Sequence, residues 1–188
     1  MEKVFIFLFL LLSLTIKAQE TLKITYSCLA RNFIEKVVPS KYDATLELNV
    51  DYSVFSRKPD ALEIKYGKEP KNKVYKSFRD GKIYFSGQIG FEKVITSEDF
   101  PNFQWEMLEG DSIVCDYHCQ KARTTFRGRT WVVWYSLDLP YSDGPWKLSG
   151  LPGLILKATD MKGDFSFSAY KIEKEQEKNN SFSTKGMA

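Results

Sequence analysis

The chain has 188 residues, of which 43% are hydrophobic and 27% charged, and its formal net charge is +3. This composition is typical of one globular domain, long enough to bury a core without metal ions or disulfide bonds as supports. The positive charge is small and spread along the chain, which argues against a nucleic-acid-binding protein, because such proteins concentrate Lys and Arg on one face. The aromatic content of 15% favours strands.

The first 18 residues have the pattern of a signal peptide. Lys3 supplies a positive start, residues 4–14 are almost entirely apolar, and Ala18 precedes the expected cleavage point. The apolar run is shorter than the ~20 residues that a membrane-spanning helix needs. Cys28 is too far from the run to receive a lipid anchor. We therefore expect an exported protein of the cell envelope, periplasmic or extracellular, with outer-membrane association left open and no membrane span after cleavage.

The mature chain alternates apolar and polar residues in short segments, which predicts strands. An Asp80-Gly81 turn signals a hairpin between residues 75–78 and 82–85. The other expected strands are residues 21–27, 43–55, 105–108, 112–126, 129–139, 153–159 and 164–172. The pattern predicts an all-β fold with little helix: a single antiparallel meandering sheet, strongly curved, half-barrel or barrel-like. The expected domain is 19–172, followed by a polar tail at 173–188.

Six residues form the most distinctive stretch, and we interpret it as structural: Gly150, Leu151, Pro152, Gly153, Leu154 and Ile155. Pro-Gly suits the two central positions of a type II turn, in which Gly153 would take a positive φ. Leu151 and Leu154 would then be buried on either side of the bend.

This hexapeptide resembles the signature of the GLPGLI family, exported Gram-negative bacterial proteins of unknown function. The resemblance covers about residues 21–172, and its further matches are Ile113, Tyr117, Cys119, Lys121-Ala122, residues 126–129, Trp134-Tyr135, Pro140 and residues 142–147. Cys115 and Asp116 stand where the family pattern has small or apolar residues. Similar proteins often continue beyond Lys178, so the chain is also interpreted as a short or truncated member. The resemblance implies no catalytic residues, and family genes near outer-membrane uptake receptors imply an accessory role in uptake.

Three cysteines, Cys28, Cys115 and Cys119, are candidates for a disulfide or for free thiols. Cys115 and Cys119 would be about 13 Å apart on a continuous strand, too far to pair unless a turn intervenes at Asp116. Cys28 could pair across strands with either one, and three buried free thiols are an equal alternative. His118, the only histidine, would point to the opposite face from both neighbouring cysteines, so we expect no metal site and no cofactor.

A second candidate site is basic and aromatic. Arg123, Arg127 and Arg129 could contact an anion or another ligand, together with Trp134 and Trp146. If Arg127-Gly128 forms a hairpin turn, Lys121 lies opposite Trp134, and packing and solubility are the simpler explanation for the stripe.

No hydrolase signature is present, and the lone His118 would have to serve any Ser or Cys mechanism. The sequence leaves enzymatic activity open, and we favour the hypothesis that the protein is not an enzyme. We expect a non-enzymatic binding or assembly module whose partner is an outer-membrane transporter, another envelope protein, or an apolar or peptide ligand. The alternative is an envelope thiol-redox or hydrolytic enzyme that uses Cys115, His118 and Cys119.

Overall fold

The computed structural model describes residues 20–31, 40–68, 70, 72–89 and 92–176. The predicted signal peptide, residues 1–18, lies outside these residues. The strands are β1 (Glu20–Ala30), β2 (Ser40–Leu48), β3 (Tyr52–Arg57), β4 (Lys73–Ser77), β5 (Lys82–Ile89), β6 (Glu92–Asp99), β7 (Glu106–Val114), β8 (Tyr117–Phe126), β9 (Arg129–Ser136), β10 (Leu154–Asp160) and β11 (Phe165–Gln176). One short helix, α1 (Ala61–Lys65), lies between β3 and β4. No helix of the described chain is long and apolar enough to cross a membrane.

All eleven strands join one antiparallel sheet in the order β6-β5-β4-β3-β2-β1-β11-β10-β9-β8-β7. The all-β prediction is confirmed, and the described strands curve without closing into a barrel, because β6 and β7 form two free edges. The two edge strands, β6 and β7, follow one another in the sequence and are joined by residues 100–105. Six residues span little more than ~20 Å, so the sheet has to curl to bring its edges near each other.

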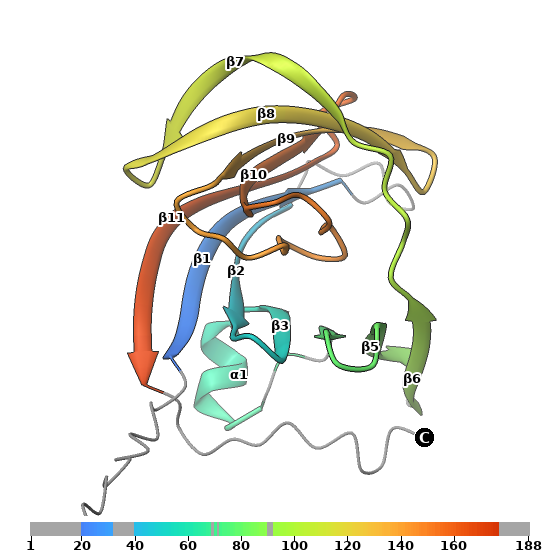
Figure 1. The fold of residues 1–188 in the computed structure, drawn as a ribbon. Helices are drawn as coiled ribbons and strands as arrows, with labels where there is room; N and C mark the ends of the chain where they lie inside the picture. The colour runs from blue at the N-terminus through green and yellow to red at the C-terminus, as the bar shows by residue number, and fades with distance from the viewer. Residues whose placement is uncertain (1–19, 32–39, 69, 71, 90–91, 177–188) are drawn as a thin grey trace, which may run out of the picture.

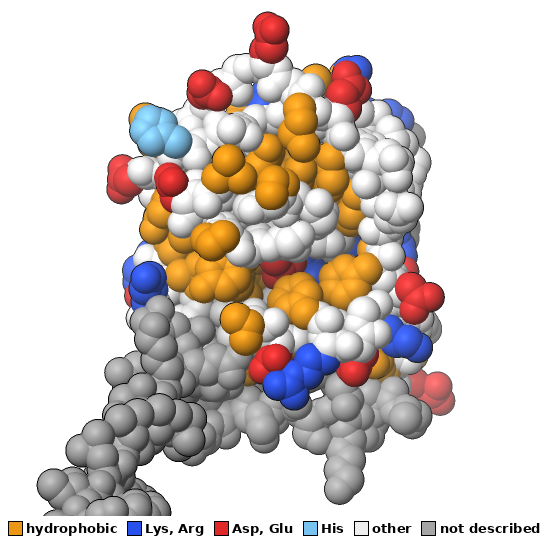
Figure 2. Space-filling model, viewed as in Figure 1, with side chains coloured by type: hydrophobic (Ala, Val, Ile, Leu, Met, Phe, Trp, Pro, Cys, Tyr) orange, Lys and Arg blue, Asp and Glu red, His pale blue; other side chains and the backbone are white. Residues whose placement is uncertain are grey.

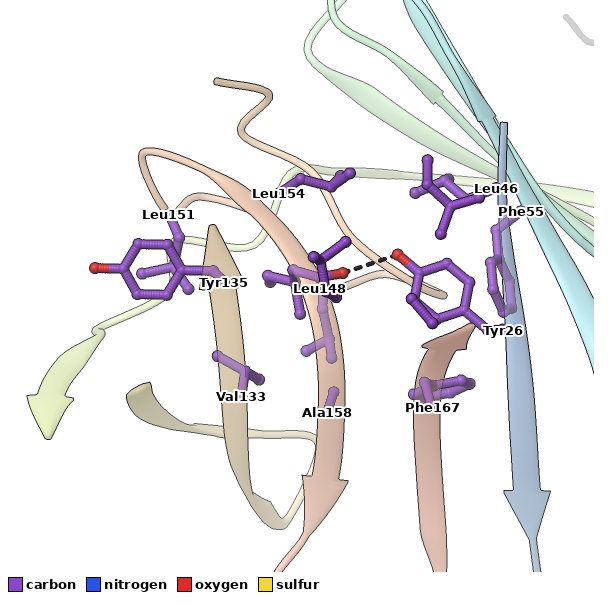
Figure 3. Close-up of a cluster of buried hydrophobic side chains, with 14 of the residues drawn as sticks. Tyr26, Leu46, Phe55, Val133, Tyr135, Leu148, Leu151, Leu154, Ala158 and Phe167 are labelled. Atoms are coloured by element: carbon purple, nitrogen blue, oxygen red, sulfur yellow. Dashed lines mark hydrogen bonds between the residues drawn. The ribbon is translucent and has the colours of Figure 1, made fainter. Parts of the chain in front are cut away.

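The segment between β9 and β10, residues 137–153, lies inside the curve of the sheet, and we call it the plug (Figure 1). Leu148 and Leu151 of the plug are buried against the inward-facing side chains of β1, β2, β9 and β10 (Figure 3). Tyr26 of β1 donates its hydroxyl proton to the carbonyl of Ile155 at 2.8 Å, which satisfies a polar group deep in this core. The plug therefore completes the core that the open sheet cannot close by itself.

Four residues of the hexapeptide at the end of the plug are buried, whereas Gly150 and Pro152 are exposed, and the turn differs from the expected one. Gly150 has the positive φ, +89°, and Gly153 does not. Gly153 is required for a different reason: a Cβ there would lie 2.1 Å from the carbonyl oxygen of Ser136. Leu151 and Leu154 are 1% and 0% exposed. The stretch is thus a close-packed crossing of two backbones.

Two expected strands are each divided by a turn. The segment expected at 43–55 is the β2–β3 hairpin, in which the Asn49 side chain accepts the amide protons of Asp51 and Tyr52. The segment expected at 112–126 breaks at Cys115 and Asp116, whose φ values of 50° and 66° suit a type I′ hairpin turn. Short polar residues such as Asn and Asp make these reversals inexpensive.

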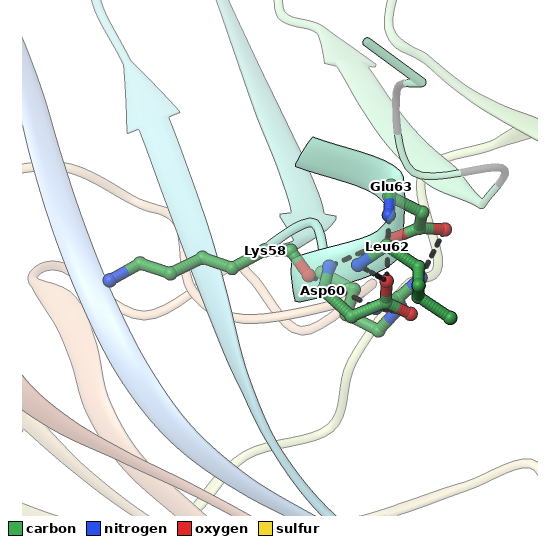
Figure 4. Close-up of polar contacts among 5 residues, drawn as sticks. Lys58, Asp60, Leu62 and Glu63 are labelled. Carbon is green, nitrogen blue, oxygen red and sulfur yellow. Dashed lines mark hydrogen bonds and ion pairs between the residues drawn. The ribbon is translucent and has the colours of Figure 1, made fainter. Parts of the chain in front are cut away.

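The helix α1 was not expected, and its first turn explains why it forms. Asp60 accepts the amide protons of Leu62 and Glu63, while the Glu63 carboxylate accepts the amide proton of Asp60 (Figure 4). This is a capping box, which satisfies the free amides at a helix start. Arg57 of β3 also pairs with Glu63 through two hydrogen bonds and ties the helix to the sheet.

Candidate functional site

Two adjoining hollows lie beside the plug, and together we call them the groove. The first has a volume of about 250 Å³ and the second about 320 Å³. Tyr42 of β2 and Trp146 of the plug line both hollows. The remaining walls of the first are Ala30, Phe126, Arg127, Arg129, Trp131, Phe165 and Phe167, and those of the second are Phe55, Arg57, Glu63, Asn72, Val74 and Phe85. Aromatic rings therefore dominate a concave surface with a few polar groups, as in many ligand sites.

Trp146 stands at the boundary between the hollows in an unusual backbone conformation. Its φ is +54°, which costs a bulky residue of the order of 1–3 kcal/mol and persists only where the surroundings impose it. Its ring lies 5.5 Å from that of Phe126 and 5.9 Å from that of Trp131, between centroids. Strained residues of this kind cluster at binding sites, which makes Trp146 the leading candidate for ligand contact.

The arginines around the groove are all neutralised by carboxylates. Arg57 pairs with Glu63, Arg127 pairs with Glu98, and Arg129 pairs with both Asp160 and Asp164. Burial, the largest single influence, acts to lower the pKa of Arg129, but the hydrogen bonds that Arg129 donates to the two aspartates and their negative charges raise this pKa overall. A guanidinium already bonded to a carboxylate has little left to offer an anion, so the groove suits a neutral ligand.

Glu98 also joins separate parts of the fold. One of its carboxylate oxygens accepts a hydrogen bond from Lys147 of the plug, and the other accepts a hydrogen bond from Arg127 of the β8–β9 turn. Arg127 in turn lies over the rings of Phe126 and Trp146, at 5.5 and 6.0 Å. Strand β6, at one edge of the sheet, is thereby linked to the β8–β9 turn near the other edge, across the Trp146 side of the groove.

The structure separates the basic and aromatic residues that the sequence grouped. Arg127, Arg129 and Trp146 meet at the groove, whereas Arg123 pairs with Glu106 and lines neither hollow. Trp134 lies outside the groove as well, between the ammonium groups of Lys121 and Lys157, which are 5.7 and 4.7 Å from its centroid. The predicted register of this hairpin is confirmed, with Lys121 opposite Trp134.

Comparison with known proteins identifies the family of this chain. The family described as "N-glycanase peptide, N-terminal domain" matches residues 49–187. The chain belongs to this family. The solved structures that it resembles include two crystal forms of PNGF-II, with TM-scores of 0.65 and 0.63 and sequence identities of 22% and 21%. This chain is covered to 86% and 87% in these matches, but it spans only 29% and 30% of the PNGF-II chains. No curated protein matches.

Membership of the N-glycanase N-terminal domain family corrects the interpretation of the hexapeptide. The resemblance to the GLPGLI family was wrong, because the matching family and the similar structures both point to N-glycanase proteins. The likeness to PNGF-II, at about one residue in five identical, establishes the fold of this domain and nothing about its chemistry.

The cysteines form no disulfide: Cys28, Cys115 and Cys119 are all free. Burial raises the pKa of Cys28 to about 12 and that of Cys119 to about 11, and it also raises the pKa of Cys115. A thiol that keeps its proton is a poor nucleophile and a poor metal ligand. Cys115 lies in the β7–β8 turn, so the separation of about 13 Å from Cys119 that was expected for a continuous strand does not apply.

A third hollow, of about 270 Å³, brings acidic residues near the histidine–cysteine segment. Its lining includes Asp111, His118, Cys119 and Asp138. Across the described residues, no three His, Cys, Asp or Glu side chains are placed to hold one metal ion. The raised pKa of Cys119, caused mainly by burial, also argues against its use as a nucleophile here.

The exposed face seen in Figure 2 carries hydrophobic side chains in several separate groups, with charged side chains mostly around its margin. The most exposed large hydrophobics of the described chain include Leu62, Ile64 and Tyr66, on or next to α1, each about two-thirds exposed. They are scattered singly or in small groups, as is normal on a protein surface. The groove remains the better candidate, because it combines concavity, aromatic walls and a strained residue.

Sequence reasoning found Trp146, Arg127 and Arg129 but missed most of the groove. Tyr42 lies in β2, just before the strand expected at residues 43–55, and Phe165 lies in β11, where it was interpreted only as a strand residue. Lys76 and Asp143 were also missed, although they form a fully buried ion pair. One signal for that pair was available in the sequence. Alternation along β4 places Lys76 on the same inward side as Val74, where an apolar residue is expected.

Proposed function

We propose that this chain is a non-catalytic binding domain that holds the glycan part of a glycopeptide for an N-glycanase. The observation that supports this most is the aromatic groove, in which Tyr42 and Trp146 line two adjoining hollows among neutralised arginines. The family is described by its occurrence as the N-terminal domain of an N-glycanase. An N-glycanase acts on carbohydrate linked to peptide, which makes a carbohydrate the natural ligand for an accessory domain.

The chemistry of a sugar fits the groove. A pyranose ring presents an apolar C–H face that can lie against an aromatic ring, and hydroxyl groups at its edge that need hydrogen-bonding partners. Tyr42 and Trp146 supply ring faces, while Asn72, Glu63 and Arg57 lie along the wall of the second hollow. Two connected hollows suit successive rings of a chain better than one compact molecule. A purely apolar ligand would offer no hydrogen bonds to the polar groups of this wall.

The alternative, a thiol-redox or hydrolytic enzyme, has less support. Its three residues, Cys115, His118 and Cys119, lie around the β7–β8 turn, and the pKa of both thiols is raised rather than lowered. Export, expected from residues 1–18, stays a proposal that would bring the domain into contact with extracellular glycoproteins. A role beside an outer-membrane uptake system is compatible with glycan binding and likewise stays a proposal.

Binding of a defined glycopeptide tests the proposal. The full chain is titrated calorimetrically with a peptide carrying a neutral N-linked glycan, with the same peptide lacking the glycan, and with the free glycan. We expect binding of both glycan-bearing ligands and none of the bare peptide. Binding of the bare peptide alone would replace glycan recognition with peptide recognition.

Two substitutions locate the binding site. Trp146→Ala and Tyr42→Ala should each weaken binding roughly tenfold, since loss of one aromatic contact costs about 1–1.5 kcal/mol. Trp134→Ala is the matched control, because it also removes a partly buried tryptophan but lies outside both hollows. If Trp134→Ala weakened binding as much as Trp146→Ala, the groove would not be the site.

A further inference from the structure

Lys76 of β4 has an environment that is unusual for a lysine. Its side chain is fully buried, and its ammonium group donates to the carboxylate of Asp143, to the carbonyl of Gly144 at 2.7 Å and to the carbonyl of Leu148 at 3.1 Å. An ammonium group has three protons to donate, so all three are used. All three acceptors belong to the plug.

The acceptors lie on both sides of Trp146 in the sequence. Asp143 and Gly144 precede it, and Leu148 follows it, so the three hydrogen bonds span the turn that carries the positive φ of Trp146. The amide of Leu148 closes the same turn by donating to the carbonyl of Pro145 at 3.1 Å. A strained conformation persists where its surroundings over-determine it, and Lys76 supplies three of the fixed points.

General stabilisation is a poor explanation for this arrangement. Removing two charges from water costs free energy that a buried ion pair often fails to recover, and apolar residues of similar size often serve stability as well or better. The second carboxylate oxygen of Asp143 has no hydrogen-bond partner among the described residues, which adds to that cost. Burial also lowers the pKa of Lys76, although Asp143 opposes this shift. What the pair supplies is a defined geometry for the turn.

We propose that Lys76 is a positioning residue for ligand binding: it holds the Trp146 turn from both sides and so fixes the ring that separates the two hollows. This rests on the groove proposed above as the ligand site. Lys76 itself lines neither hollow and acts only through the plug. A neutral glycan would then meet a rigid Trp146, without the loss of affinity that ordering a mobile loop entails.

The test uses a paired variant, Lys76→Met with Asp143→Asn, which removes the ion pair without leaving one buried charge alone. The chain has four tryptophans, so labelling with 5-fluorotryptophan gives one fluorine NMR signal each for Trp105, Trp131, Trp134 and Trp146. In the unliganded paired variant we expect the Trp146 signal to shift or broaden while the Trp134 signal stays. Affinity for the neutral N-glycan should fall about tenfold.

Tyr26→Phe is the matched control, since it also removes a buried hydrogen bond close to the plug, to the carbonyl of Ile155 in β10. It should leave the Trp146 signal and the affinity near those of the wild type. An unchanged Trp146 signal in the paired variant, or an equal change in Tyr26→Phe, would overturn the proposal. Because this signal is read without ligand, it decides the role of Lys76 even if no glycan binds, in which case the proposed function alone fails.

If the paired variant does not fold, nitrogen-15 NMR of the lysine ammonium groups in the wild type replaces it. Lys76, held by three acceptors and shielded from water, should give a signal protected from exchange with solvent. That signal should move when the neutral N-glycan fills the groove, because the ligand touches Trp146 and the turn touches Lys76. A protected Lys76 signal that stays unchanged on saturation with the glycan would contradict coupling between the two residues.

Discussion

Replacing Gly153 with alanine puts one methyl group into a space that the backbone of β9 already occupies. The Cβ would lie 2.1 Å from the carbonyl oxygen of Ser136, 2.6 Å from its carbonyl carbon and 3.1 Å from the amide nitrogen of Leu137. Overpacking a core typically costs about 1–3 kcal/mol. These neighbours are backbone atoms that cannot rotate away, so we expect about 3 kcal/mol or more. For a domain of this size, that corresponds to a fall in melting temperature of roughly 6–12 °C.

Gly163→Ala is the comparison for Gly153→Ala. Gly163 has a φ of +70° and no atom within 4 Å of an added Cβ, so only the backbone cost of about 1–2 kcal/mol applies. Urea denaturation of both variants measures the two losses. If Gly153→Ala cost no more than Gly163→Ala, the close backbone crossing would not be what requires glycine at position 153, and the account of the hexapeptide would fail.

Three further changes test the core, the thiols and the link across the groove. Leu151→Ala should lower the free energy of unfolding by about 2–5 kcal/mol, while Ile113→Ala, at a residue 64% exposed, should stay within about 0.5 kcal/mol of wild type. Because the pKa of Cys28 rises from 9.0 to about 12 on folding, its contribution to stability is complete below pH 9 and is lost as the pH rises toward 12. Urea titrations across that range should show a decline that is smaller in Cys28→Ala. Glu98→Gln should cost up to about 1 kcal/mol at low salt and much less in 1 M NaCl, and a salt-independent loss would argue against ion pairing.

Local signals were sufficient where a turn or an alternation was decided by neighbouring residues. Asp80-Gly81 predicted the β4–β5 hairpin, and Arg127-Gly128 predicted both the next turn and the pairing of Lys121 with Trp134. The same reasoning failed at residues 49–51, where alternation continues through the turn. Continued alternation would put Val50 on the same side as Leu46 and Leu48, which are buried, yet Val50 is 73% exposed because the chain has already reversed.

The groove depends on contacts between distant parts of the chain, and local patterns carry no record of them. Tyr42 and Trp146 line the same hollows because the curved sheet and the plug bring β2 and residues 137–153 together. Gly144-Pro145 is a turn signal that indicates a reversal near Trp146, but it does not indicate the positive φ of Trp146 in a turn that accepts hydrogen bonds from the buried Lys76. Arginines likewise look available in sequence, and only the fold shows the carboxylates that pair with them.

The measurement that tests the central claim most directly is a crystal structure of the full chain with a neutral N-glycan bound. We expect sugar density in the two adjoining hollows, with one ring against Trp146 and another beside Tyr42, and the ion pairs of Arg57, Arg127 and Arg129 intact. Sugar density confined to the outer face around Trp134, with the groove unoccupied at saturating glycan, would contradict the account.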